Sequence, residues 1–139
     1  MQLRTFAILY GTVFLLAGVA GFIPGLSPEH THPGLSLTAS SRLALGLFPV
    51  NLVHNLVHLA FGVWGISAAR TTTGAQAYAR GVAIIYAALT VLGLLPLANT
   101  MFGLVPLYGN DIWLHALLAI VAAYFGFVHH ERARGANRG

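Results

Sequence analysis

Four apolar stretches of about twenty residues each set the strongest constraint on how this chain folds. They cover residues 5–23, 48–69, 77–97 and 111–129 of the 139. A helix of about 20 apolar residues crosses the hydrocarbon core of a bilayer. Hydrophobic residues make up 57% of the chain and charged residues 7%, whereas a soluble domain carries about 25% charged residues. The sequence therefore predicts one all-α domain over residues 1–139, a transmembrane four-helix bundle.

The arginines predict how these helices are oriented. With four crossings, six arginines fall on one side of the membrane and only Arg42 falls on the other. The six are Arg4, Arg70, Arg80, Arg132, Arg134 and Arg138. Because cytoplasmic loops carry the excess of Lys and Arg, we expect both termini in the cytoplasm. The expected location is a bacterial cytoplasmic (inner) membrane, with the lipid bilayer around the bundle.

Residue counts also exclude several classes of function. The chain has no cysteine, which excludes disulfides, thiolate metal sites and iron–sulfur clusters. Its seven basic residues are scattered at the ends of apolar stretches, whereas nucleic-acid-binding proteins gather theirs in a patch. No nucleic-acid partner is therefore expected. A homo-oligomer and a separate membrane partner subunit both remain open.

Three histidines lie inside the apolar stretches. His54 and His58 are one helical turn apart in the second stretch, and His115 lies in the fourth. Ionisable side chains are costly in a membrane and usually have a function there. Counted back from Arg70 and Arg132, His54 and His115 both lie about 24–26 Å from the inner charges, at ~1.5 Å per residue. We expect these two at the same depth, with His58 one turn deeper.

Helical spacing predicts that the histidines face the inside of the bundle. Asn51, His54 and His58 share one stripe of the second helix with two glycines, Gly62 and Gly65, and such small residues allow close helix packing.

The fourth helix has a comparable stripe, on which Asp111 precedes His115 by one turn. Asp111 is also expected to cap this helix, since aspartate is a preferred N-cap residue. The two stripes together predict that the three imidazoles converge in the outer half of the bundle.

One interpretation of this cluster is a metal site. His54, His58 and His115 would hold a divalent metal such as zinc, with Asp111 and Asn51 orienting a ring nitrogen or a bound water. Three protein ligands and one open position are typical of catalytic zinc. If such a protein is an enzyme, the expected activity is that of a zinc-dependent intramembrane hydrolase.

Other interpretations remain open at this point. His54 and His115, level on different helices, could instead hold b-type haem in an electron-transfer protein, since four-helix bundles bind cofactors between facing helices. A structural or assembly subunit would use the same polar side chains only to hydrogen-bond across helices. His30 and His32, in the outer loop beside Glu29, form a weaker candidate metal site.

The motif Asn51-Leu-Val-His54-Asn-Leu-Val-His58-Leu-Ala-Phe-Gly62, with Asp111-Ile-Trp-Leu-His115 later in the chain, resembles an uncharacterised family. It is a family of small bacterial four-helix membrane proteins, catalogued as a domain of unknown function. The resemblance extends over nearly the whole chain. It implies a four-span bacterial membrane protein and assigns no activity.

Overall fold

The computed structural model describes residues 1–129 and shows a mostly helical protein. Its helices are α1 (Leu3–Ala20), α2 (Leu52–Ala68), α3 (Thr72–Leu94) and α4 (Asn110–Ala123), and a π-helix, η1 (Tyr124–Val128), continues α4. The all-α prediction is wrong in one place, because β1 (Arg42–Ala44) and β2 (Phe48–Val50) form a small antiparallel hairpin. Arg132, Arg134 and Arg138, which the sequence analysis places on the cytoplasmic side, lie outside the described residues.

Three of the helical segments are long and apolar enough to cross a membrane. They are α1, α3 and the continuous segment Asn110–Val128, whereas α2, with 17 residues, is apolar but shorter. Their outward faces carry large apolar side chains, among them Leu16, Ile84 and Ile120, which are 65%, 63% and 68% exposed. Outward-facing apolar side chains of this kind suit contact with lipid better than contact with water.

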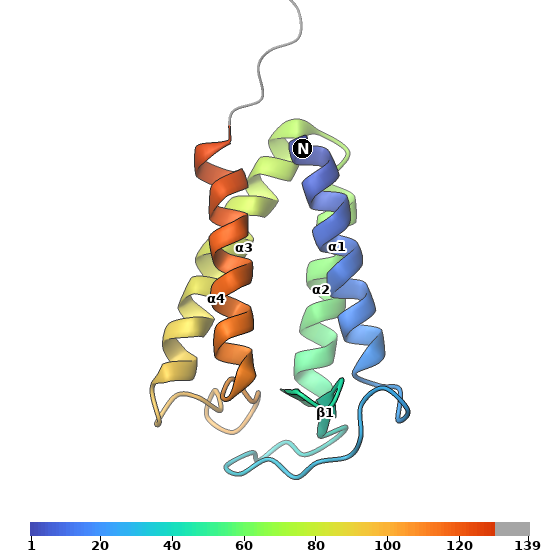
Figure 1. Cartoon of the computed structure of the whole chain (residues 1–139), viewed down its shortest axis with the longest axis vertical. Helices are drawn as coiled ribbons and strands as arrows, with labels where there is room; N and C mark the ends of the chain where they lie inside the picture. The colour runs from blue at the N-terminus through green and yellow to red at the C-terminus, as the bar shows by residue number, and fades with distance from the viewer. Residues whose placement is uncertain (130–139) are drawn as a thin grey trace, which may run out of the picture.

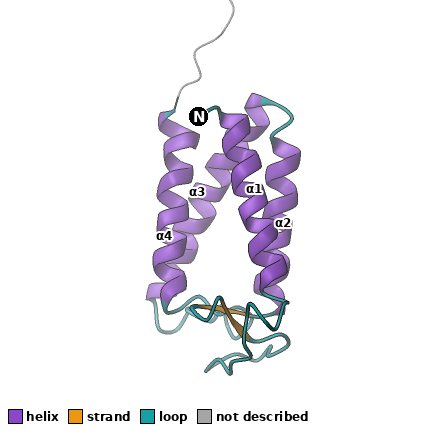
Figure 2. Cartoon of the chain, turned by 45° about the vertical axis from the view of Figure 1, so that its right-hand side comes forward, coloured by secondary structure: helices purple, strands orange, loops and turns teal. Residues whose placement is uncertain are grey.

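The helices pack as two pairs, α1 with α2 and α3 with α4. Residue 1 and the end of η1 lie at one end of the bundle, the terminal end, and the long loops 21–51 and 95–109 lie at the other, the loop end (Figure 1). Figure 2 shows the ribbons of the two pairs diverging toward the loop end.

Close packing within the first pair depends on glycine. A Cβ added to Gly11 would lie 2.9 Å from the backbone oxygen of Gly62 on α2. Small residues of this kind let two membrane helices approach closely.

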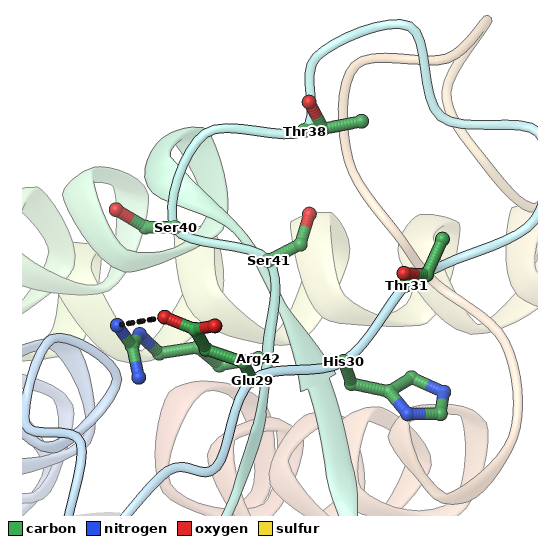
Figure 3. Close-up of a pocket in the computed structure, with 7 residues that line it drawn as sticks. All are labelled: Glu29, His30, Thr31, Thr38, Ser40, Ser41 and Arg42. Carbon is green, nitrogen blue, oxygen red and sulfur yellow. Dashed lines mark hydrogen bonds and ion pairs between the residues drawn. The ribbon is translucent and has the colours of Figure 1, made fainter.

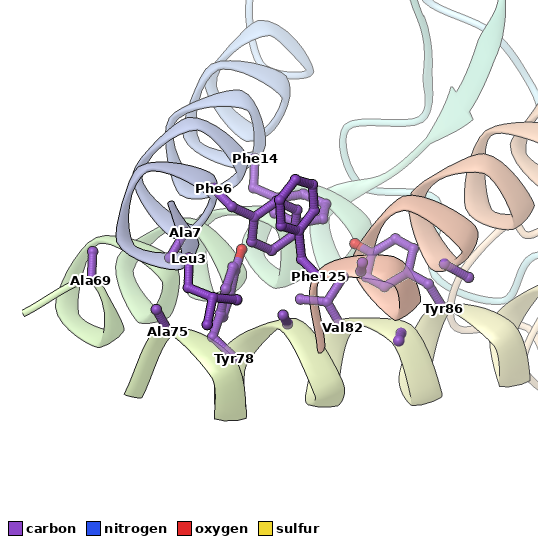
Figure 4. Close-up of a cluster of buried hydrophobic side chains, with 14 residues drawn as sticks. Leu3, Phe6, Ala7, Phe14, Ala69, Ala75, Tyr78, Val82, Tyr86 and Phe125 are labelled. Carbon is purple, nitrogen blue, oxygen red and sulfur yellow. The ribbon is translucent and has the colours of Figure 1, made fainter. Parts of the chain in front are cut away.

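Aromatic side chains join the two pairs near the terminal end (Figure 4). Phe6 of α1 stacks on Phe125 of η1, with ring centroids 4.5 Å apart. Phe6 and Tyr78 are fully buried in this cluster. Arg80 donates from Nε to the backbone oxygen of Gly126, 2.9 Å away, which gives one carbonyl of the π-helix a partner outside the helix.

The helix within the second predicted span, 48–69, starts four residues after the start of that span. Residues 48–50 are extended and pair with β1, in the register Arg42↔Val50 and Ala44↔Phe48. Proline lacks an N–H, and the residue before it favours extended backbone, so Phe48 and Pro49 precede the helix. The side chain of Asn51 accepts a hydrogen bond from the His54 backbone N–H and caps α2, which begins at Leu52.

The predicted third span, 77–97, is displaced by several residues. The Thr71 hydroxyl accepts a hydrogen bond from the Gly74 N–H, so α3 is capped there and starts at Thr72. The helix ends at Leu94, and Leu95 is extended because it precedes Pro96. Residues 71–74 thus form the capped start of α3.

Candidate metal centre

The three intramembrane histidines lie together, as the helical spacing predicts. Each offers one ring nitrogen to a group in which all three nitrogens are within 4.8 Å of one another. The rings of His54 and His58 have centroids 4.5 Å apart, and those of His54 and His115 are 6.0 Å apart. The α1–α2 pair therefore supplies two imidazoles, and the α3–α4 pair supplies the third.

These imidazoles are buried and incompletely hydrogen-bonded. His54, His58 and His115 are 3%, 8% and 1% exposed. The Nδ1 atom of each makes no hydrogen bond with any residue in the range 1–129. Buried polar atoms are nearly always paired, so three orphaned nitrogens at one place require an explanation.

Asp111 lies beside this cluster and does not cap its helix. Its Oδ2 atom is 3.6 Å from His54 Nδ1, and the side chain is 2% exposed. The predicted N-cap role is wrong, since α4 begins at Asn110 after Gly109, which has φ 69° and provides no side-chain cap. When one ring nitrogen of a histidine binds a metal, a carboxylate that accepts a hydrogen bond from the other ring nitrogen fixes the orientation of the ring.

Asn51 holds the loop end together. Its Nδ2 atom donates to the backbone oxygens of Leu37, at 3.0 Å, and Leu104, at 2.7 Å. Its Oδ1 atom accepts from the His54 backbone N–H at 3.0 Å. Asn51 therefore positions the backbone of His54 and ties the loops 21–51 and 95–109 to α2. The structure shows no contact of its side chain with a histidine ring, and direct support of a ligand by Asn51 remains a prediction.

Tyr86 belongs to the site and was missed by the sequence analysis. Its ring packs edge-on against His115, with centroids 5.0 Å apart, and is 1% exposed. Such edge-to-face contacts restrict the orientation of both rings. The available signal was the spacing of Tyr78, Val82 and Tyr86, which marks one inward stripe of α3.

Asn55 shares the inward face of α2 but points to α1. It is fully buried, and neither polar atom of its side chain has a partner among the described residues. A Cβ added to Gly21 would overlap its amide group, so Asn55 occupies space that only glycine leaves free.

A cavity of about 190 Å³ borders the three imidazoles. Apart from the histidines, its walls are almost wholly apolar. They include Val57 and Phe61 of α2, Ile85 and Leu89 of α3, and Leu107 of the loop at residues 95–109. The three candidate ligands therefore border a space that a small apolar molecule can fill.

The two loop histidines do not form a comparable cluster. His32 is buried, and its Nε2–H donates to the backbone oxygen of Arg42, 2.9 Å away. Burial lowers the pKa of His32, because a low-dielectric environment disfavours the imidazolium ion. His30 is exposed, and within residues 1–129 neither histidine belongs to a group of three metal-ligating side chains.

His30 instead lines an open, polar hollow of about 830 Å³ in the loop 21–51 (Figure 3). Arg42 lies in this hollow and donates to Glu29 Oε1 at 3.4 Å and to the backbone oxygen of Ser27 at 3.0 Å. The ring of His30 points away from this ion pair. Metal binding by the loop histidines remains a prediction without a third ligand in the described residues.

The arrangement of the buried imidazoles suits a tetrahedral metal with little adjustment. Ligand nitrogens stand about 2.0–2.1 Å from zinc, and hence about 3.3 Å from one another. The nitrogens here lie within 4.8 Å of one another, so each pair would have to approach by at most about 1.5 Å to bind one zinc ion.

Comparison with known proteins gives a family and no activity. No curated protein and no solved structure matches the chain. One family model, described as a domain of unknown function (DUF4383), matches residues 4–128. That range contains α2, α3, α4 and all of α1 except its first residue, together with the three histidines and Asp111. The chain belongs to the DUF4383 family.

Proposed function

We propose that this protein is an integral membrane protein that binds one divalent metal ion, preferably zinc, through His54, His58 and His115. The observation that carries the proposal is the convergence of three ring nitrogens within 4.8 Å at a buried site where each imidazole has an unpaired Nδ1. Neutral imidazole is a preferred zinc ligand, and three ligands leave a fourth position open. Asp111 would hold the His54 ring in the binding orientation.

The missing hydrogen bonds favour a metal over a purely structural cluster. Polar side chains that serve only to pack membrane helices do so by bonding across them. Here the Nδ1 atoms of His58 and His115 make no hydrogen bond with any described residue, and Nδ1 of His54 faces only Asp111 Oδ2, 3.6 Å away. An uncompensated buried polar atom costs about 1–3 kcal/mol, which a metal bound through Nδ1 of His58 and of His115 would offset, with His54 binding through Nε2.

The size of the cavity favours a metal over haem. A cavity of about 150 Å³ accommodates benzene, and the cavity beside the imidazoles is about 190 Å³. A porphyrin has several times the area of a benzene ring and would require the α1–α2 and α3–α4 pairs to separate.

The proposal places the protein in a bacterial cytoplasmic membrane with both termini in the cytoplasm. The positive-inside rule supports this orientation, because Arg42 is the one arginine predicted on the loop side. The two ends of the described chain also lie at the same end of the bundle (Figure 1). The histidines then lie in the outer half of the membrane.

Elemental analysis of purified protein tests the metal proposal. After zinc loading and removal of free metal, the wild type and His30→Ala are expected to retain about one zinc per chain. The variants His54→Gln, His58→Gln and His115→Gln are expected to lose it while remaining folded by circular dichroism. Glutamine keeps hydrogen-bonding capacity, so a structural cluster would tolerate it.

Two outcomes would contradict the metal proposal. One is a folded wild type that retains no divalent metal after loading. The other is equal zinc content in the wild type and the three glutamine variants, which would place the bound zinc elsewhere.

A further inference from the structure

The cavity beside the imidazoles is bounded by two parts of the membrane-spanning region. Val57 and Phe61, one turn apart on α2, form one wall, and Ile85 and Leu89, one turn apart on α3, form the wall opposite. Leu107, from the loop at residues 95–109, lies at the loop end and is 1% exposed. The three imidazoles and Tyr86 also border the cavity, whose surface is almost wholly apolar.

This cavity is accessible from the lipid-facing side. Val57 is 37% exposed and Ile85 is 39% exposed, although both also line the cavity. These side chains lie on helices of adjacent pairs, whose ribbons diverge toward the loop end (Figure 2). Because Val57 of α2 and Ile85 of α3 are each part of both the outer surface and the cavity lining, the cavity approaches that surface between these two helices.

The lining selects against charged molecules. A charged group in an apolar space without a partner pays a large desolvation cost, and the partners available here are imidazoles or the metal they would hold. Because a cavity of about 150 Å³ takes the six carbons of benzene, about 190 Å³ takes a molecule or segment of about eight heavy atoms.

We infer that the ligand of this site is an uncharged, lipid-soluble molecule that enters between α2 and α3. Its apolar part fills the cavity, and one polar oxygen points toward the three imidazoles. The orientation of that oxygen rests on the proposed function, because it requires a metal with an open fourth position. Entry of the apolar part depends only on the cavity.

Photolabelling with phenyl azide tests whether a small apolar molecule enters the cavity. The protein is reconstituted in lipid vesicles, irradiated with this small apolar probe and mapped by mass spectrometry. Leu107 is expected to be labelled although it is 1% exposed, whereas Ala79, which is fully buried away from the cavity, is not. Benzene is expected to protect Leu107 and not the lipid-facing Leu56, which is 50% exposed.

A matched pair of variants locates the entrance. Val57→Trp fills the opening and is expected to lower labelling of Leu107 by about tenfold, since an occupied cavity cannot take the probe. Leu56→Trp places the same ring one residue away on the lipid side and should leave that labelling unchanged. Benzene protection in the wild type still shows whether the probe enters the cavity, even if Val57→Trp does not fold.

Benzyl alcohol, which has eight heavy atoms, tests the orientation of the oxygen. In zinc-loaded protein it is expected to protect Leu107 at about tenfold lower concentration than after chelation, because its hydroxyl occupies the open metal position. Benzene should protect equally with and without zinc. Unlabelled Leu107 in the wild type, or labelling insensitive to benzene, overturns the inference.

Benzyl alcohol could protect Leu107 equally with and without zinc while labelling and benzene protection remain intact. That result overturns the claim that the metal orients the ligand, and it leaves the apolar entry route standing. Zinc content measured on the same vesicles shows whether the metal site itself failed. The two failures are thereby distinguished.

Discussion

Replacing Asn51 is expected to release both outer loops from the start of α2. Its side chain is fully buried and makes three hydrogen bonds, to the His54 N–H and to the backbone oxygens of Leu37 and Leu104. Loss of an N-cap costs about 1 kcal/mol, and loss of each hydrogen bond to a backbone oxygen costs about 1 kcal/mol more. We therefore expect Asn51→Ala to lower the free energy of unfolding by about 3 kcal/mol.

Asn51→Asp separates the cap from the loop contacts. Aspartate caps a helix as well as asparagine does, but its carboxylate has no hydrogen to donate to the Leu37 and Leu104 oxygens. It also places an unpaired charge against two carbonyl groups in a buried position. We expect this variant to be less stable than Asn51→Ala by about 1–2 kcal/mol at neutral pH.

Equilibrium unfolding in mixed micelles, followed by circular dichroism, measures both effects. Asn110→Ala is the control, because its side chain reaches the Leu47 oxygen at 3.2 Å from an exposed position. If the free energy of unfolding of Asn51→Asp were close to that of the wild type, only the helix cap would matter. The claim that Asn51 ties both loops to α2 would then be wrong.

Two further predictions concern helix packing and pH. Gly11→Ala is expected to lower the thermal midpoint, at a cost of about 1–3 kcal/mol, because its Cβ would lie 2.9 Å from the Gly62 oxygen. Gly25→Ala is the control, since its Cβ would meet nothing within 4 Å and should leave the midpoint unchanged. Equal midpoints for the two variants would refute the close contact. Because burial lowers the pKa of His32 in the folded protein, the unfolded chain takes up the proton first as pH falls below about 6.5. The thermal midpoint should therefore fall with acidification more steeply in the wild type than in His32→Gln, and identical pH profiles would contradict this.

Periodicity and depth were sufficient to predict the histidine cluster. The i, i+4 spacing of His54 and His58 fixes them on one face of any helix, whatever its neighbours. The depth of His115 follows from the rise per residue, once the fourth stretch is taken as a helix. These two rules do not depend on the loops, which explains why errors at the span boundaries left the cluster intact.

The features that escaped prediction depend on contacts between segments distant in the sequence. The strands β1 and β2 have three residues each, too few for an alternating pattern to be seen. Asp111 has the chemistry of an N-cap residue, but its side chain lies with His54 because that contact is available only in the folded bundle. Tyr86 likewise reaches His115 from a different helix, and sequence does not give the crossing angle that joins them.

The distribution of contacts along the bundle links metal binding to its assembly. Near the terminal end, the α1–α2 and α3–α4 pairs are joined by apolar packing such as the Phe6–Phe125 stack, which requires no ligand. Toward the loop end, the groups facing one another across the pairs include His54, His58, His115 and Asp111. A metal held by His54 and His58 of one pair and His115 of the other would cross-link the pairs at that end.

Such a metal stabilises the docked arrangement by an amount set by its concentration relative to its dissociation constant, about 2.7 kcal/mol at a hundredfold excess. Because the same contacts bind the metal and close the bundle, any change that separates the pairs must also weaken the site. A ligand whose oxygen occupies the open metal position would therefore favour the docked pairs together with the metal, and its binding would be coupled to that of the metal. Benzene, which fills only the apolar space, would lack that coupling.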